Sequence, residues 1–336
     1  MAKKSFQNLH SLGIRHFDEL IHDQPKSWLI QNFKEGATVH PLNVTRLMRN
    51  IIWQLRERIV NKEREPLREL IRTFWYMFIK PTLSRAGALS RKADQYDQLV
   101  SVLVDLVKRK KIMFYKDIGF RDDNRSGRQV GINANVIIFA EKSGHQDFLD
   151  DMYSRYQVNT ISLGGQPSVL NTEYFVDDIK ASGVNLKRSF YLFSIVDFDT
   201  SGWIIRDAFI DNLNAFGIKN IKNIDLIHPD MLTPEEIKFS KFTLPDKKGM
   251  RSKNTKWIRE VRKAGYTNMK YLTPRRSQSR RTIYGLEAEA ISMKRIEAKL
   301  EELMVPLLGK SERLLRIFQL EQLNNSLREL ILLKIA

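Results

Sequence analysis

The chain has 336 residues, of which 42% are hydrophobic, so it is long enough for two domains with substantial apolar cores. It contains no cysteine, which excludes disulfides, zinc–thiolate sites and thiol nucleophiles and agrees with a reducing cytoplasm. The N-terminal residues lack the apolar core of a signal peptide, and no stretch approaches the roughly 18 uninterrupted apolar residues of a membrane span. We therefore expect a protein that does not cross a membrane.

The formal net charge is +17, and it is distributed unevenly along the chain. Residues 1–134 carry a net charge of +11, residues 135–229 of −4, residues 230–285 of +10 and residues 286–336 of zero. An acidic segment thus lies between two strongly basic ones, which suits a protein that holds a polyanion beside a metal site. The alternative is a generally basic protein, but the segregation of charge favours nucleic acid as the partner.

The first part of the chain shows helical patterns followed by a basic hairpin pattern. After an N-terminal extension (1–40), apolar residues recur at helical spacing, and short apolar runs flank a polar turn. The helices are expected at 41–62, 66–81 and 96–107, and the strands at 112–120 and 128–132. Three helices followed by a hairpin is the order of a winged helix, so residues 41–134 are predicted to form a winged-helix DNA-binding domain.

Tyr76 lies on the polar side of the predicted helix 66–81. The apolar stripe of that helix, at about 100° per residue, comprises Leu67, Leu70, Ile71, Phe74 and Phe78. Arg72 precedes Tyr76 by four positions and Lys80 follows it by four, so the tyrosine is placed between two cations for an anionic partner. The alternative is an exposed or interface tyrosine without chemistry. Tyr115 is a second candidate nucleophile, although its predicted strand favours a packing role.

From residue 135 the pattern changes to an alternation of strands and helices. The strands are expected at 136–140, 158–163, 191–196 and 224–228, and the helices at 148–156, 169–181 and 203–216. This alternation predicts a mostly parallel, Rossmann-like sheet, and residues 135–336 are predicted to form one domain with C-terminal helices. Ligand sites in such sheets lie at the carboxyl ends of the strands.

Polar residues follow three of these predicted strands. Glu141 follows the first strand, the glycine-rich loop Gly164–Ser168 the second, and Asp197 and Asp199 the third. If the first and third strands are neighbours, three carboxylates converge, and Mg²⁺ with phosphate oxygens as further ligands is their natural partner. The alternative is that Asp199 only caps the following helix.

The order and spacing of these motifs resemble the A subunit of topoisomerase VI and its relatives, including the meiotic protein that cleaves DNA to start recombination. The resemblance covers about residues 40–300 and includes the Arg72–Tyr76 motif, Glu141, Gly164–Ser168 and Asp197-x-Asp199. It also includes Tyr284–Ala290, which resembles the late helix that carries a family glutamate. Family members join a winged-helix domain that bears a nucleophilic tyrosine to a Toprim domain. The chain differs at Thr200, where the family often has proline, and at Trp75, where it usually has tyrosine or phenylalanine.

The resemblance implies Mg²⁺-dependent double-strand DNA cleavage and religation with a 5′-phosphotyrosyl intermediate. Tyr76 would be the nucleophile, Arg72 would hold the scissile phosphate, and Glu141, Asp197 and Asp199 would bind one or two Mg²⁺ ions. Further candidate DNA contacts are Lys80, Lys108, Arg109, Lys110, Lys111, Arg125, Arg128, Arg275 and Arg276.

The resemblance also implies partners and a location. The protein would act as a homodimer, with Tyr76 of one protomer facing the metal site of the other. The sequence contains no P-loop motif, so any use of ATP requires a partner such as a GHKL-type ATPase B subunit. We expect the protein at the nucleoid in the cytoplasm, or in the nucleus if it is eukaryotic.

Two other functions remain open at the level of sequence. A Toprim nuclease would use water in place of Tyr76 and leave free 5′-phosphate ends without attached protein. A non-catalytic DNA-binding scaffold would leave DNA unchanged in the presence of Mg²⁺.

Overall fold

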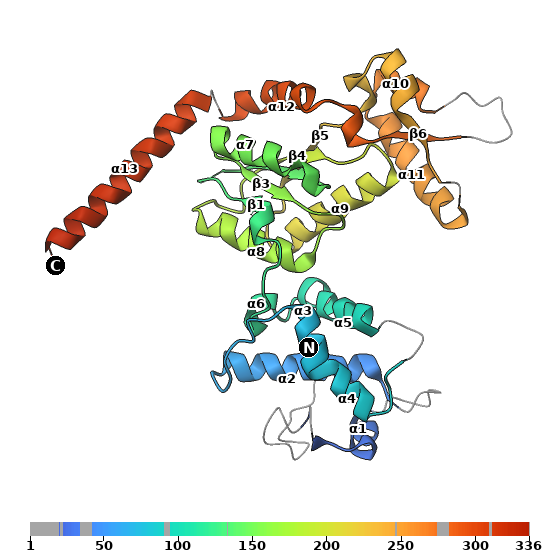
Figure 1. Cartoon of the computed structure of the whole chain (residues 1–336), viewed down its shortest axis with the longest axis vertical. Helices are drawn as coiled ribbons and strands as arrows, with labels where there is room; N and C mark the ends of the chain where they lie inside the picture. Colours follow the sequence, from blue (N-terminus) through green and yellow to red (C-terminus); the bar gives the residue numbers. More distant parts are fainter. Residues whose placement is uncertain are drawn as a thin grey trace. The chain divides into compact units, whose positions relative to one another are not determined.

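The computed structural model describes residue 20 and residues 23–33, 42–90, 95–132, 134–245, 247–273, 282–308 and 311–335. The chain forms two compact units, Met1–Asp123 and Asn124–Ala336 (Figure 1). The division falls somewhat before the boundary at 134/135 that the sequence suggests. Most of the expected extension 1–40 lies outside the described residues. None of the described helices is both long enough and apolar enough to cross a bilayer.

The first unit is built from helices in its described part. They are α1 (Lys26–Phe33), α2 (Val44–Val60), α3 (Ile71–Phe74), a π-helical turn (Trp75–Ile79), α4 (Lys80–Arg85), α5 (Gln95–Val104), a second π-helical turn (Asp105–Arg109) and α6 (Tyr115–Ile118). The amphipathic α2 confirms the helix predicted at 41–62, and its buried face includes Leu47, Ile51 and Leu55. Asn43 caps it by accepting a hydrogen bond from the backbone N–H of Arg46.

The helix predicted at 66–81 has different limits in the structure. It begins only at Ile71 and continues past Pro81 to Arg85. Pro81 stands in the first turn of α4, directly after the π-helical turn, where its missing N–H costs no regular helical hydrogen bond. Arg68 has a positive φ of 56°, which ends any helical pattern that starts at Pro66.

The prediction of a strand at 112–120 is wrong, because this segment contains the short helix α6 (Tyr115–Ile118). Its start is capped by Asp117, which accepts a hydrogen bond from the backbone N–H of Phe114, and its end by Gly119 with φ 81°. The strand predicted at 128–132 does form in part, as β1 (Arg128–Gln129), but it pairs with a strand of the second unit. The two strands therefore make no hairpin, and the expected wing is not seen in the described residues.

The second unit contains a five-stranded, mostly parallel sheet. Its strands are β1, β2 (Val136–Ala140), β3 (Asn159–Ser162), β4 (Phe190–Ile195) and β5 (Ile221–Asp225), in the order β1-β3-β2-β4-β5. Only β1 runs antiparallel to its neighbour. This confirms an α/β fold with a mostly parallel sheet, which is compatible with a Rossmann-like domain. β2 and β4 are direct neighbours, as the convergence of the carboxylates requires.

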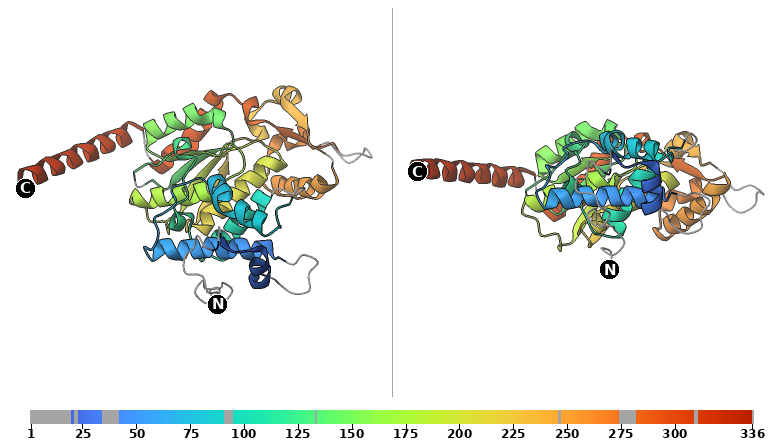
Figure 2. Two further views of the ribbon diagram at one scale, coloured as in Figure 1. Left: turned by 60° about the horizontal axis from the view of Figure 1, so that its bottom comes forward. Right: turned by 90° about the horizontal axis from the view of Figure 1, so that it is seen from below.

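Helices cover both faces of this sheet, so alternate residues of its inner strands are buried on opposite sides. On one face, Ile137 and Phe139 pack against α8 (Val169–Ala181) and α9 (Thr200–Ala215). On the other, Val136 and Ile138 share a core with α7 (Gln146–Tyr156). Figure 2 shows α7 and α8 on opposite sides of the sheet.

The elements that complete the core on the α7 face are α10 (Pro234–Ser240), β6 (Lys241–Thr243), α11 (Lys248–Lys263), β7 (Tyr284–Leu286) and α12 (Met293–Leu308). The chain then continues into the long helix α13 (Ser311–Ile335). The strands β6 and β7 pair with each other. The segment Tyr284–Ala290, expected as part of a helix, is instead β7 followed by a short 3₁₀ turn. Helix α12 does cover the core, through Ile296, Leu300 and Met304.

Gly202 allows the first turn of α9 to approach the end of β4. A Cβ atom at this position would lie 2.1 Å from the carbonyl oxygen of Asp197. We expect Gly202→Ala to lower the free energy of unfolding by about 1–3 kcal/mol, the usual cost of overpacking, in urea denaturation of the full chain. Gly144→Ala is the control, because an added Cβ there meets nothing within 4 Å. An equal effect in both variants would contradict this account.

Candidate functional site

Three carboxylates lie together at the carboxyl ends of β2 and β4. Glu141 directly follows β2, and its carboxylate accepts a 3.4 Å hydrogen bond from the backbone N–H of Asp197, which follows β4. The backbone N–H of Glu141 in turn donates to the carbonyl oxygen of Ile195. Strand pairing thus continues up to the acidic residues and brings them together from two separate parts of the chain.

The glycine-rich loop after β3 also reaches this edge of the sheet. Gly164 and Gly165 have φ angles of 61° and 113°, which favour glycine, and the backbone N–H of Gly165 donates to the carbonyl oxygen of Glu141. The loop therefore fixes the backbone of Glu141 from its other side.

Each aspartate of the pair has a backbone donor. Asp199 caps α9, since its carboxylate accepts a 2.7 Å hydrogen bond from the backbone N–H of Gly202. This is the capping role that the sequence suggests as the alternative to metal binding. The carboxylate of Asp197 accepts a 2.8 Å hydrogen bond from the backbone N–H of Ala288. That contact exists because Phe198, between the aspartates, pairs in antiparallel fashion with Leu286.

Lys142 provides a positive charge to the acidic cluster. Its ammonium nitrogen lies 3.1 Å from a carboxylate oxygen of Asp197 and 2.7 Å from one of Glu289. Burial opposes the charge of Lys142, but the hydrogen bonds to the two carboxylates outweigh it, and the pKa of Lys142 is raised. The pKa of Glu289 is lowered, because the hydrogen bond from Lys142 outweighs its partial burial.

The carboxylates of the strand ends carry more negative charge than their surroundings compensate. Burial raises the pKa of Glu141, and the charges of Asp197 and Asp199 raise it further. Burial also raises the pKa of Asp199, which the charge of Asp197 reinforces against the opposing hydrogen bond from Gly202. Such crowding favours either a proton or a further cation at this edge of the sheet.

The donor set fits a hard divalent cation in its chemistry, since Mg²⁺ prefers one or two carboxylates plus water and phosphate oxygens. Among the described residues, however, no three carboxylate or imidazole groups stand in the arrangement of a preformed metal site. In this structure Asp197 is paired with Lys142, which would have to leave Asp197 for a metal ion to bind there. Asp199 caps α9 through one carboxylate oxygen.

Tyr76, in the first unit, lies in the π-helical turn Trp75–Ile79, and its side chain is exposed (51%). It lines a pocket of about 300 Å³ together with Arg72, Lys80 and Tyr96. The ammonium of Lys80 lies 4.9 Å from the centre of the Tyr76 ring. By contrast, Tyr115 is buried (2%), which agrees with its expected packing role.

Tyr96 holds the arginine of this pocket in place. The guanidinium of Arg72 lies 4.2 Å from the centre of the Tyr96 ring and is hydrogen-bonded to its phenol group. Burial raises the pKa of Tyr96, although Arg72 opposes the shift, so this phenol is neutral at physiological pH. The pocket thus presents two cations beside an accessible tyrosine, an arrangement that suits a phosphate group.

The other predicted DNA contacts differ in their surroundings. Arg109, Lys110 and Lys111 are all exposed, and the ammonium of Lys110 lies 3.2 Å from the carboxylate of Asp105. Lys108 lies in the second π-helical turn. Arg275 and Arg276 lie outside the described residues.

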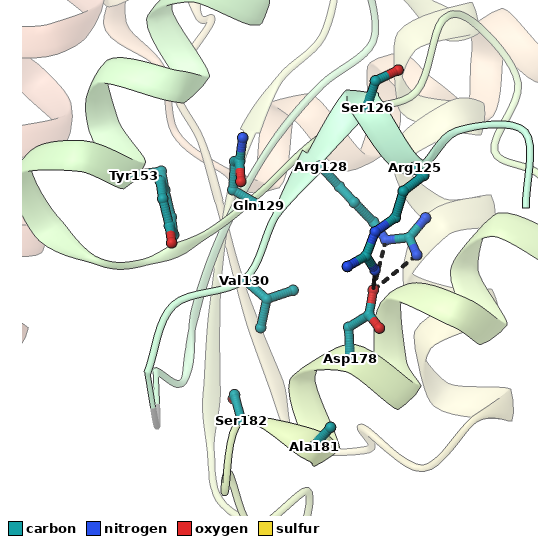
Figure 3. A pocket seen from close by; sticks show the side chains of 9 residues that line it. All are labelled: Arg125, Ser126, Arg128, Gln129, Val130, Tyr153, Asp178, Ala181 and Ser182. Atoms are coloured by element: carbon teal, nitrogen blue, oxygen red, sulfur yellow. Dashed lines mark hydrogen bonds and ion pairs between the residues drawn. The ribbon is translucent and has the colours of Figure 1, made fainter. Parts of the chain in front are cut away.

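Arg125 and Arg128 belong to the second unit, where both bind Asp178. The side chain of Arg128 is almost fully buried (2% exposed) and that of Arg125 largely exposed (72%). They lie at a pocket of about 450 Å³ lined by parts of β1, α7 and α8. Figure 3 shows both guanidinium groups facing the carboxylate of Asp178, with Tyr153 across the pocket. The contacts to Asp178 hold the start of the second unit against α8.

Sequence reasoning missed three residues of the two sites: Lys142, Glu289 and Tyr96. Lys142 is adjacent to Glu141, and Glu289 lies in the late motif Tyr284–Ala290, so both were close to residues already singled out. No sequence pattern around Tyr96 indicated its role, because its contact with Arg72 depends on how α5 packs. No protein-family model matches the chain, and no curated protein matches its sequence.

The crowding of the carboxylates is expected to lower the stability of the metal-free protein. We expect Glu141→Gln and Asp199→Asn each to raise the thermal midpoint of the chain in EDTA at neutral pH, because each removes a disfavoured charge and keeps a hydrogen-bond acceptor. A carboxyl group whose pKa is higher in the folded state than in the unfolded state stabilises the fold at pH values below its unfolded-state pKa. This stabilisation is lost as the pH rises through the folded-state pKa. The advantage of each variant should therefore grow toward neutral pH and vanish below about pH 4.

Differential scanning calorimetry in EDTA across this pH range measures the effect. Glu235→Gln, at an exposed carboxylate on α10, is the control. Variants that are less stable than the wild type at neutral pH would contradict the crowding of charge.

Proposed function

We propose that the chain is the DNA-cleaving subunit of a type IIB topoisomerase-like enzyme, which cuts and rejoins double-stranded DNA with Mg²⁺ and a tyrosine nucleophile. The observation that carries the proposal is the meeting of Glu141, Asp197 and Asp199 at the ends of two adjacent parallel strands. Sites of this kind hold the metal ions of phosphoryl-transfer enzymes. The accessible Tyr76 between Arg72 and Lys80 supports a covalent step.

In the proposed step, the phenol oxygen of Tyr76 forms a bond to the phosphorus of a DNA phosphodiester and loses its proton to water. The bond from phosphorus to the 3′ oxygen breaks, and the 3′-hydroxyl group leaves with a proton. Arg72, held by Tyr96, binds the phosphate oxygens. The 5′-phosphotyrosyl bond conserves the energy of the phosphodiester, so the 3′-hydroxyl can attack it and rejoin the strand.

Glu141, Asp197 and Asp199 would hold Mg²⁺, which supplies positive charge to the phosphate when bound. Lys142 supports this assignment, because its ammonium already lies between two carboxylates where a cation is favoured. Binding of metal would require Lys142 to leave Asp197 and remain on Glu289. The internal ammonium is thus a competitor of the metal ion.

The homodimer and the helical DNA-reading unit are parts of the same proposal. Cutting both strands requires two tyrosines, and each protomer offers one. Exposed leucines on α13, Leu320, Leu323, Leu327 and Leu330, follow the alternating three- and four-residue spacing of a coiled-coil seam, which supports pairing with a second copy. A GHKL-type ATPase partner would couple the reaction to ATP.

We expect Tyr76→Phe to abolish a covalent protein–DNA adduct, because phenylalanine has no oxygen to attack phosphorus. The assay traps the adduct with denaturant after incubation with supercoiled DNA and Mg²⁺, with and without a GHKL-type ATPase partner and ATP. Tyr271→Phe, at an exposed tyrosine of the second unit, is the matched control and should keep the adduct.

The products separate the three candidate functions. An adduct that survives Tyr76→Phe would exclude Tyr76 as nucleophile. Cut DNA with free 5′-phosphate ends and no adduct would favour a nuclease that uses water, and unchanged DNA under every condition would favour a binding scaffold.

If the ammonium of Lys142 competes with Mg²⁺ for Asp197, removal of this ammonium should change the affinity for Mg²⁺. We expect Lys142→Met to tighten Mg²⁺ binding on the order of tenfold, because removal of one nearby positive charge is worth roughly one pKa unit of interaction or more. Calorimetric titration of Mg²⁺, or of Mn²⁺ detected by electron paramagnetic resonance, measures this without DNA. Lys299→Met, at a lysine paired with Glu302 on α12, is the control. Unchanged or weaker binding in Lys142→Met would exclude competition.

A further inference from the structure

Helix α11 exposes a dense row of positive charge that the proposed cleavage site does not include. Its sixteen residues contain seven lysines and arginines and one carboxylate, Glu260. The exposed cations, which we call the α11 basic surface, are Arg251, Lys253, Lys256, Arg259, Arg262 and Lys263. Lys256, Arg259 and Lys263 recur at three- and four-residue spacing and so form one stripe about 10 Å long on the face opposite Trp257.

The opposite face of α11 is buried and fixes the helix to the acidic cluster. Trp257 is 3% exposed and Val261 is fully buried. The ring of Trp257 packs edge-on against Phe198 with centroids 5.5 Å apart, and Phe198 is the residue between Asp197 and Asp199. The stripe is therefore attached rigidly to the strand end that carries two of the carboxylates.

A polar contact adds a second attachment at the same place. Asn254 is buried (3% exposed), and its side-chain oxygen accepts a 2.7 Å hydrogen bond from the hydroxyl of Thr200, the residue after Asp199. Its amide nitrogen donates to the carbonyl oxygen of Pro245. The polar and aromatic contacts together set the position of α11 relative to the first turn of α9.

The charge of the stripe remains available to a partner. Glu260 contacts both Arg259 and Lys263, at 3.6 and 3.2 Å, but the two cations are 69% and 66% exposed. Exposed pairs of this kind contribute little to stability, and one carboxylate leaves the helix strongly positive. The folded chain thus gains little from keeping this face so basic.

We propose that the α11 basic surface binds the phosphate backbone of duplex DNA and leads it toward the strand-end carboxylates. A membrane surface is a poorer partner, because an interfacial helix needs a free apolar face and that of α11 is buried against Phe198. A rigid linear row of cations matches the regular charge of a duplex, which binds by releasing counterions. The proposal rests on the proposed function only for the destination of the DNA, not for the contact itself.

The test compares two charge-matched triple variants of the full chain in EDTA, where no metal is available. The first variant combines Lys256→Gln, Arg259→Gln and Lys263→Gln. The control combines Lys187→Gln, Lys219→Gln and Lys222→Gln, which are exposed and lie at or before the N-terminal ends of β4 and β5, at the opposite edge of the sheet. Fluorescence anisotropy with a labelled duplex is measured over a series of NaCl concentrations.

We expect the α11 variant to reduce the slope of log affinity against log salt by about 2–3, as the loss of three phosphate contacts requires. Its affinity at moderate salt should fall on the order of tenfold or more. The control should keep the wild-type slope. A variant that exchanges the same three positions between lysine and arginine preserves their charge and should also keep the slope.

Three results would overturn the proposal. One is a slope in the α11 variant equal to that of the control. The second is loss of binding to single-stranded RNA with duplex binding unchanged, and the third is loss of binding only to vesicles of phosphatidylserine. Failure of the proposed cleavage is distinguished by the adduct assay, since a reduced slope together with no adduct would leave the α11 contact in place and remove only the chemistry.

Discussion

The parallel pairing of β2 with β4 is the constraint on which the rest of the second unit depends. It brings Glu141 and Asp197 to the same edge of the sheet, where their charges repel. A protein that folds with such an edge must supply donors to it. The chain does so with the backbone of Gly202, with the backbone of Ala288 and with the ammonium of Lys142. Several groups that are distant in the sequence thus together compensate the negative charge at this edge of the sheet.

These donors also show why a capping role and a metal-binding role for Asp199 are compatible. A carboxylate has two oxygens, and the described contact to Gly202 uses one of them. The cap fixes the side chain at the start of α9 and leaves the other oxygen for a cation. The same holds for Asp197, where the contact with Ala288 sets the position of the group whose charge Lys142 balances.

The sequence predicted the second unit better than the first, for physical reasons. Strands β2 and β4 are continuous apolar runs with polar ends, so their limits are visible, and the carboxylates at those ends follow from parallel pairing. The segment around α6 begins with the apolar and aromatic run 112–115, which is typical of a strand, but Asp117 and Gly119 cap a short helix there. The ion pair of Lys142 with Glu289 spans 147 positions, so no local pattern could have revealed it.

A departure from regular helix geometry adds to the exposure of Tyr76. Phe74 and Trp75 are buried, as are Phe78 and Ile79, whereas Tyr76 and Met77 are exposed. Two adjacent buried pairs four residues apart fit a π-helical turn, because the wider turn brings both pairs onto one face. A regular helix at 100° per residue would spread these four side chains over a broader arc and bring part of it nearer to Tyr76. The burial of four large side chains therefore both offsets the unfavourable turn and holds the tyrosine outward, beside Arg72 and Lys80.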